Sequence, residues 1–261
     1  MNATRNVLFV GIMLILGSVF FGNPERAVAS QKGMVSFTID DGEDTTYDIV
    51  YPIIDRFRYR ATLYITTDWM NIRNHLTWSE LRTLEREGWE IGNHTANHDY
   101  LTLKKFSKKK IRKDFRRSMA AFAKNGINTE KIKSFAPPYG KMNKKLLAVV
   151  KEFGFTSVRW AWPKKDHLNS REDFDTFGIE AINLKRPIKL EDVKSHIDRA
   201  AEENKWLVFL THRVVNGKPK KGQFNSAQLN EILEYVDEYV RKGDLEVVTV
   251  GEGVSAMNSA R

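Results

Sequence analysis

The fold of this protein is decided by one stretch, Val35-Ser36-Phe37-Thr38-Ile39-Asp40-Asp41-Gly42. Its apolar, β-branched and aromatic residues are typical of a buried strand, which stops at two adjacent carboxylates and a glycine. Folds built on parallel strands bind ligands at the carboxyl ends of those strands. Neighbouring side chains on an extended strand point to opposite sides, so Asp40 and Asp41 are expected to do different jobs, one at a metal and one with a proton. The alternative is a plain strand-to-turn junction.

Helical and strand patterns alternate along the rest of the chain. Strands are expected at Ala61–Thr66, Trp89–Gly92, Lys133–Phe135, Phe155–Val158, Gly178–Ile182, Trp206–Leu210 and Leu245–Val250. Helices are expected at Thr45–Phe57, from the capping box at Thr77 to Gly88, and at Lys108–Lys124, Asn143–Phe153, 190–203 and 226–242. This alternation predicts an α/β fold: a distorted (β/α) barrel of about seven parallel strands in a single domain. A flat doubly wound sheet is the alternative.

The first 30 residues have the pattern of a secretory signal peptide. Arg5 supplies a positive charge, an apolar run of 15 residues extends from Val7 to Phe21, and Ala27-Val28-Ala29 offers a small-x-small cleavage site. The run is short for a membrane span, which needs about 20 residues. Residues 1–30 are therefore expected to be a signal peptide that exports a domain at 31–261 to the periplasm, the cell surface or the medium. An uncleaved anchor is the alternative.

Charge and cysteine content narrow the classes of partner. The 261 residues carry a formal net charge of +9, which suits an anionic partner such as a cell-wall polymer, nucleic acid or lipid head groups. A basic cluster runs from Lys104 to Arg117, either as the solvated face of an amphipathic helix or as a grip for an anion. Because no RNA-binding motif or zinc finger accompanies it, no nucleic-acid partner is predicted, and no stable protein partner either. The chain has no cysteine, which excludes disulfides and thiolate metal sites.

Two histidines four residues apart, His94 and His98, follow an expected strand. Together with one carboxylate of the Asp40-Asp41 pair they make a ligand set suited to a divalent metal with open positions for water and substrate. Imidazole nitrogens and a carboxylate favour zinc, and leave cobalt, nickel or iron open. No glycine-rich phosphate loop follows a strand, so a nucleotide cofactor is not expected.

Four motifs resemble those of the polysaccharide deacetylases with a NodB homology domain, the carbohydrate esterase family 4 type. They are Phe37-Thr38-Ile39-Asp40-Asp41-Gly42, His94-x-x-x-His98, Phe135-Ala136-Pro137-Pro138-Tyr139-Gly140 and Leu210-Thr211-His212. Their order and separations also match, and they span about residues 35–213. The acid pair and the histidine pair are specific in combination, whereas the last motif would be weak by itself.

The resemblance implies a role for each motif. It makes Asp40 the catalytic base, Asp41, His94 and His98 the metal ligands, and His212 the general acid. The backbone N–H of Tyr139 would stabilise the oxyanion, in a loop stiffened by Pro138 and the proline before it.

Two departures from the family pattern concern the partners of the base and the acid. The arginine that pairs with the base is replaced by Ala136, and Arg159 is a candidate substitute arriving from another strand end. The fourth motif keeps tryptophans, Trp160 and Trp162, either of which is expected to stack on a sugar ring or to pack in the core. Its aspartate is missing, and either Asp166, Asp173 or Asp175 orients His212 or His212 has no carboxylate partner.

The resemblance thus implies a metal-dependent deacetylase that hydrolyses the N-acetyl group of N-acetylhexosamine units in a polysaccharide such as peptidoglycan or an exopolysaccharide. Two alternatives stay open. The missing arginine and aspartate would suit a carbohydrate-binding relative with weak or no turnover. The same residues would also serve an O-acetyl esterase on a xylan-like polymer, because ester and amide hydrolysis share a tetrahedral intermediate.

Overall fold

The structure is a computed structural model that describes residues 32–161, 168–185 and 187–259. Its strands are β1 (Gly33–Asp41), β2 (Thr62–Ile65), β3 (Glu90–Asn93), β4 (Ser134–Phe135), β5 (Ser157–Val158), β6 (Leu168–Asn169), β7 (Ile182–Asn183), β8 (Trp206–Thr211), β9 (Val214–Val215), β10 (Phe224–Asn225) and β11 (Leu245–Val247). Its α-helices are α1 (Tyr51–Asp55), α2 (Trp78–Arg86), α3 (Lys108–Lys124), α4 (Lys144–Glu152), α5 (Leu190–Glu202), α6 (Ser226–Lys242) and α7 (Val250–Ser259). A π-helical segment η1 (Thr46–Val50) precedes α1, and short 3₁₀ turns occur at η2 (Thr67–Trp69), η3 (Thr129–Lys131) and η4 (Pro138–Gly140).

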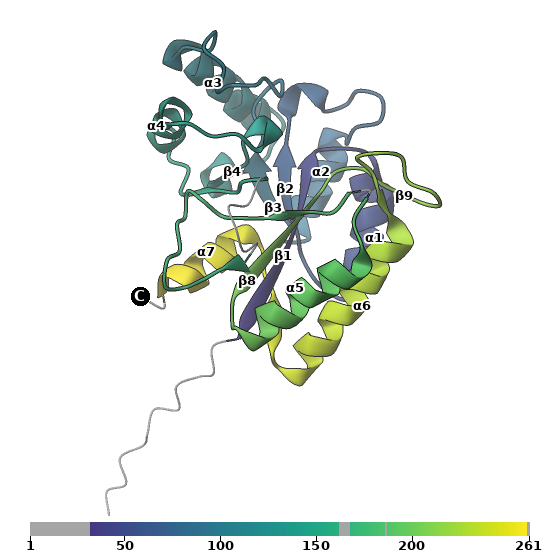
Figure 1. The fold of residues 1–261 in the computed structure, drawn as a ribbon. Coiled ribbons are helices and arrows are strands. Elements are labelled where there is room, and N and C mark those ends of the chain that lie inside the picture. Colours follow the sequence, from purple (N-terminus) through teal and green to yellow (C-terminus); the bar gives the residue numbers. More distant parts are fainter. Residues whose placement is uncertain (1–31, 162–167, 186, 260–261) are drawn as a thin grey trace, which may run out of the picture. The chain divides into compact units, whose positions relative to one another are not determined.

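Nine of the strands form one curled, mostly parallel sheet with β1 in its middle (Figure 1), and β9 and β10 pair as a separate two-stranded sheet. From β1 the sheet runs through β2, β3 and β4 to β5 on one side, and through β8 to β7 on the other, all in parallel. A parallel bridge between Arg159 and Ile179 joins the end of β5 to the segment that leads into β7. The sheet therefore curls back on itself as a distorted barrel, with β6 antiparallel on β8 and β11 beside the start of β1.

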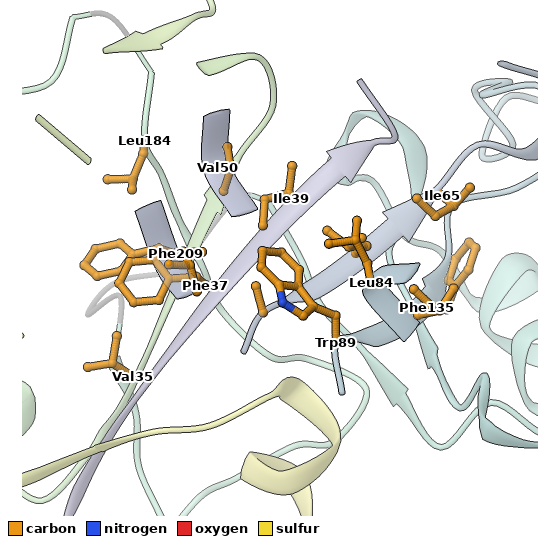
Figure 2. Packing of buried hydrophobic residues seen from close by; sticks show 14 of the residues in the cluster. Val35, Phe37, Ile39, Val50, Ile65, Leu84, Trp89, Phe135, Leu184 and Phe209 are labelled. Carbon is orange, nitrogen blue, oxygen red and sulfur yellow. The ribbon is translucent and has the colours of Figure 1, made fainter. Parts of the chain in front are cut away.

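Alternate residues of β1 pack into two separate apolar clusters. Val35, Phe37 and Ile39 belong to the larger cluster, between the sheet and the surrounding helices, and Phe37 packs on Phe209 of β8 with ring centroids 5.5 Å apart (Figure 2). Met34, on the other side of the strand, belongs to the smaller cluster inside the curl. The second face of β1 therefore points inward, and it ends at the buried Asp40.

Helix α7 packs across the amino ends of the strands. The backbone N–H of Val250 donates to Thr62 at the start of β2, and that of Gly251 donates to Glu90 at the start of β3. A Cβ atom at Gly253 would lie 2.5 Å from the Trp206 ring, so only glycine lets the helix approach β8 this closely. One end of the curl is thus filled by apolar side chains, and the carboxyl ends of the strands are left for a site.

The predicted architecture is confirmed, with three local differences. The predicted strand Gly178–Ile182 is interrupted, making a bridge at Ile179 and then β7. The predicted strand Leu245–Val250 ends at Val247, and its last residue begins α7 instead. The two-residue strands β6, β9 and β10 were not predicted, because two residues carry no periodic signal. No helix in the described part of the chain combines the length and the hydropathy of a membrane-spanning segment.

Candidate active site

The acid pair at the end of β1 does not alternate as expected. Asp41 has a left-handed backbone, φ 74°, and this turns its carboxylate toward the same place as that of Asp40. Asp40 Oδ2 lies 3.8 Å and Asp41 Oδ1 3.4 Å from the Nε2 atom of His94. The prediction that the two carboxylates point to opposite sides was wrong, because the strand geometry stops at Asp41.

His94 and His98 converge on Asp41. The Nε2 atom of His98 also lies 3.4 Å from Asp41 Oδ1, and possible ligand atoms of the three residues lie within 4.8 Å of one another. The Nδ1 atom of His94 is 2.6 Å from the Ala136 carbonyl oxygen. A carbonyl only accepts, so Nδ1 donates to Ala136 and Nε2 is the ring nitrogen that faces Asp41.

The electrostatics of this cluster suit a cation. Burial alone would raise the pKa of Asp41, but the nearby His94, together with His212 and His98, holds this pKa well below the usual value. Burial, reinforced by the charge of His94, lowers the pKa of His98 to about 4, so its imidazole is neutral at pH 7. Asp41 Oδ1 is buried and lacks a hydrogen-bond partner. One orphaned carboxylate oxygen facing two imidazole nitrogens fits a zinc-type divalent ion.

The loop between the two histidines is fixed by helix α3. Asp114 of α3 accepts a hydrogen bond from the backbone N–H of Ala96 at 3.1 Å, and Asn93 Nδ2 donates to Ser118 of α3 at 2.7 Å. Within the loop, Thr95 and His98 both have left-handed backbones, with φ 74° and 60°. Such conformations persist only where surrounding contacts impose them, and α3 supplies those contacts.

The His98 ring is held between aromatic side chains. Its centroid lies 5.1 Å from the ring of Trp69 and 4.7 Å from that of Tyr139. Tyr139 is itself left-handed, φ 60°, and its side chain is 55% exposed, whereas Pro138 before it is buried. The double-proline loop thus lies directly against a candidate metal ligand.

Arg159 reaches Asp40 from the end of β5. Its Nη2 atom donates to Asp40 Oδ1, and both side chains are almost fully buried. The guanidinium carbon lies 4.9 Å from the ring centroid of Tyr64, the residue paired with Asp40 in the β1–β2 register. A Cβ atom at position 92 would lie 2.5 Å from the Tyr64 ring, so Gly92 makes room for this stack. The cation absent at Ala136 is supplied by the neighbouring strand.

A cavity of about 590 Å³ opens over these residues. His212, after the end of β8, lines it together with Asp40, Asp41, His94, His98 and Tyr139. Thr211, before it, donates to the Leu184 carbonyl at 3.2 Å, and Arg213, after it, forms ion pairs with Glu43 and Asp44. The loop that carries His212 is therefore tied to the turn that follows the acid pair.

The structure separates two of the candidate carboxylates from His212, in agreement with the alternative that His212 has no carboxylate partner. Asp173 and Asp175 line a different cavity, of about 690 Å³, beside β6. Asp166 and Trp162 lie outside the described residues. Within the part of the chain that the structure describes, no carboxylate forms an ion pair with His212.

Trp160 is a packing residue rather than a wall of the cavity. Its indole N–H donates to the Phe177 carbonyl at 2.8 Å and its ring packs on the main apolar cluster, so the sugar-stacking prediction is not supported for it.

Sequence reasoning missed part of the cavity wall and the support of the histidine loop. Asn183, Lys185, Asp192 and His196 line the cavity from β7 and α5. No motif marked them, since only the barrel closure brings β7 and α5 to this edge. Asp114 did carry a signal: it adjoins the buried stripe of α3, where a carboxylate needs a partner.

Comparisons with known proteins agree with this geometry. The sequence profile of the polysaccharide deacetylase family matches residues 27–158. The chain is 26% identical to the peptidoglycan-N-acetylglucosamine deacetylase of Bacillus cereus, over 80% of this chain and 92% of the relative. It is 31% identical to the poly-β-1,6-N-acetyl-D-glucosamine N-deacetylase of Staphylococcus aureus, over 47% of this chain and 46% of the relative. A family 4 carbohydrate esterase from Streptomyces lividans, solved in complex with acetate, shares the fold with a TM-score of 0.53 at 17% identity, over 82% of this chain and 90% of that one. By sequence and by fold, the chain belongs to the polysaccharide deacetylase family.

Proposed function

We propose that this protein is an exported, metal-dependent deacetylase that hydrolyses the N-acetyl group of N-acetylhexosamine units in a polysaccharide. The observation that carries the proposal is the convergence of Asp41, His94 and His98, with Asp40 beside them in the same cavity. Both curated relatives are named for N-acetylglucosamine polymers, which supports this substrate class. The signal-peptide pattern of residues 1–30 supports export.

Asp41, His94 and His98 would hold the ion, and Asp40 would act as the base. A divalent metal bound there supplies Lewis-acid polarisation of the acetyl carbonyl and of the attacking water. Asp40 lies next to the ligand cluster but is held by Arg159, so its second oxygen is left to remove a proton from water.

The other cavity residues match the remaining steps of amide hydrolysis. The tetrahedral oxyanion requires a hydrogen-bond donor, and the backbone N–H of Tyr139 is the proposed one, in a loop that the prolines and the contact with His98 hold in place. His212 would protonate the leaving amine, because an unprotonated amide nitrogen is a poor leaving group. The products are acetate and a free amino sugar.

Acetate release tests the proposal directly. The purified protein, with zinc or cobalt added, is expected to release acetate from peptidoglycan, poly-N-acetylglucosamine or chitin oligomers. Asp40→Asn is expected to abolish release while leaving the affinity for the oligomer intact. No release from any N-acetylglucosamine polymer would overturn the proposal. Release from acetylated xylan alone would identify an O-acetyl esterase, and binding without turnover a carbohydrate-binding protein.

A further inference from the structure

The positive charge of this protein is concentrated in one segment. Residues 99–152 hold 16 of the 42 lysines and arginines but only 4 of the 33 aspartates and glutamates, a net +12, while the whole chain carries +9. The remainder of the sequence has 26 basic and 29 acidic residues, a net −3. A charge separated in this way produces a directed field, which a uniformly basic protein would not.

This charge lies on the loop after His98, on α3 and at the start of α4, which we call the basic surface. Its exposed lysines include Lys104, Lys105, Lys108, Lys109, Lys113 and Lys144. Helices α3 and α4 are neighbours (Figure 1). The ion pair of Arg112 with Glu152 joins them. Among the described residues, the only other ion pair of this segment joins Arg117 to Asp68, so none of the six lysines is neutralised by a carboxylate contact.

The basic surface adjoins the mouth of the cavity. Tyr139 lines the cavity, and its ring centroid lies 5.0 Å from that of Tyr100, four residues before Lys104. The side chain of Asn143, next to Lys144, donates to the Thr102 carbonyl at 3.1 Å. A polymer that leaves the cavity over Tyr139 therefore meets the lysines on both sides of this contact.

The chemistry of the surface favours an anionic glycan over nucleic acid or lipid. Its exposed cations are mostly lysines, which act as hydrated point charges and not as bidentate phosphate clamps. The aromatic residues of α3, Phe115 and Phe122, are buried, so they are not available to stack on bases. The apolar stripe of α3 faces the core, and the exposed large apolar side chains of the segment are Leu103 and, at the cavity mouth, Tyr139, which are too few for membrane insertion.

We infer that the basic surface binds carboxylate groups of the same glycan whose N-acetyl units enter the cavity. The inference rests on the proposed function, and it narrows the substrate to an N-acetylhexosamine polymer that also carries carboxylates. The carboxylates that the basic surface binds belong to the same polymer and not to a separate partner, because the basic surface and the cavity mouth are continuous. A neutral N-acetylglucosamine polymer would enter the cavity without using the surface.

Cosedimentation of the full protein with insoluble glycans tests the inference. The probes are peptidoglycan sacculi stripped of phosphate polymers, the same sacculi with their carboxyl groups methyl-esterified, and chitin. Raising NaCl from about 50 to about 250 mM is expected to weaken binding to the stripped sacculi by at least about tenfold, because added salt screens exposed charges. Binding to esterified sacculi and to chitin is expected to be weak and insensitive to salt.

Two triple variants with the same loss of charge test whether the basic surface is the part of the protein that binds the sacculi. The triple variant Lys104→Gln, Lys109→Gln, Lys113→Gln is expected to bind stripped sacculi about tenfold more weakly than the wild type. The variant Lys218→Gln, Lys220→Gln, Lys221→Gln removes the same charge from an exposed loop elsewhere and is expected to stay within about twofold. Acetate release from neutral chitin oligomers is expected to be unchanged in both.

Several results would overturn the inference. One is an equal loss of sacculus binding in the two triple variants, which would show that the binding depends on the net charge of the protein and not on the basic surface. Others are binding that survives esterification, binding that requires the phosphate polymers, or stronger competition by duplex DNA or phosphatidylglycerol vesicles than by soluble sacculus fragments. A protein that releases no acetate but shows the expected binding pattern would overturn the proposed function and leave the basic surface standing.

Discussion

Arg159 and Asp40 are 119 residues apart in the sequence and form an ion pair inside the barrel, with both side chains almost fully buried. The Tyr64 ring lies against the guanidinium. The cation therefore holds one oxygen of the candidate base, and removing it would leave a buried carboxylate unpaired.

Arg159→Met is expected to reduce kcat/KM by about 100-fold and the free energy of unfolding by about 3 kcal/mol, because a buried charge that loses its partner is strongly destabilising. Acetate release and urea denaturation measure the two effects. The control is Arg112→Met, which breaks a surface pair with Glu152 and is expected to change neither. Full activity in Arg159→Met would show that Asp40 does not depend on this cation.

Asp41→Asn is expected to weaken zinc binding by at least about 100-fold, because it removes the charged ligand. Asparagine tolerates a left-handed backbone, so the fold around residue 41 should persist. Competition with a chromophoric chelator measures the affinity, and circular dichroism checks the fold. Asp48→Asn, at an exposed site outside the cluster, is the control. Unchanged affinity in Asp41→Asn would remove Asp41 from the ligand set.

Asp114→Ala is expected to lower zinc affinity by about tenfold without touching a ligand, because residues that orient ligands typically contribute that much. The loop between His94 and His98 would lose the acceptor of the Ala96 N–H. Asp114→Asn keeps a carbonyl oxygen there and is expected to restore most of the affinity. Equal affinities for the alanine variant and the wild type would show that the loop holds its shape unaided.

The same aspartate makes stability depend on pH. Burial raises the pKa of Asp114 from 3.8 to about 6 in the folded protein, so ionisation disfavours folding. The loss of folding free energy that this ionisation causes is absent below pH 3.8. It grows as the pH rises to about 6 and is complete above that. The metal-free wild type is expected to lose on the order of 2 kcal/mol relative to Asp114→Asn across this window. Urea midpoints at intervals across it measure the difference, and a constant difference would contradict the shift.

His212→Gln is expected to slow N-acetyl hydrolysis by about 100-fold or more, since the leaving amine must be protonated. Hydrolysis of 4-nitrophenyl acetate should fall much less, because nitrophenolate leaves without a proton. The ratio of the two rates is the measurement. An equal loss on both substrates would indicate that His212 acts at another step. His75→Gln, whose ring packs on Trp69 outside the cavity lining, is the control.

Local signals in the sequence predicted the elements well. The capping box of Thr77 and Glu80 opens α2, and α3 has the bounds that the basic amphipathic pattern predicts. Helix α7 was not predicted, because two glycines close together, Gly251 and Gly253, are typical of a loop. In the structure, Gly253 lies in the helix and lets the Trp206 ring pack closely against it.

Within the site, the sequence predicted which side chains converge but not how the backbone brings them together. The carboxylates of Asp40 and Asp41 point to the same place because Asp41 has a left-handed backbone, and a two-residue motif does not predict a φ angle. The pairing of Arg159 with Asp40 depends on the curl of the sheet, which no local pattern encodes. For Trp160 the residue type suggested sugar binding, but the side chain packs against the main apolar cluster instead.

Four non-glycine residues with left-handed backbones gather at one edge of the barrel: Asp41, Thr95, His98 and Tyr139. Each costs about 1 kcal/mol that a glycine would largely avoid. A chain selected for heat resistance alone would replace them, and in doing so would lose the carboxylate, the imidazole and the aromatic ring that they position. Efforts to raise the melting temperature of this protein should therefore leave this edge untouched and look for gains around the helices.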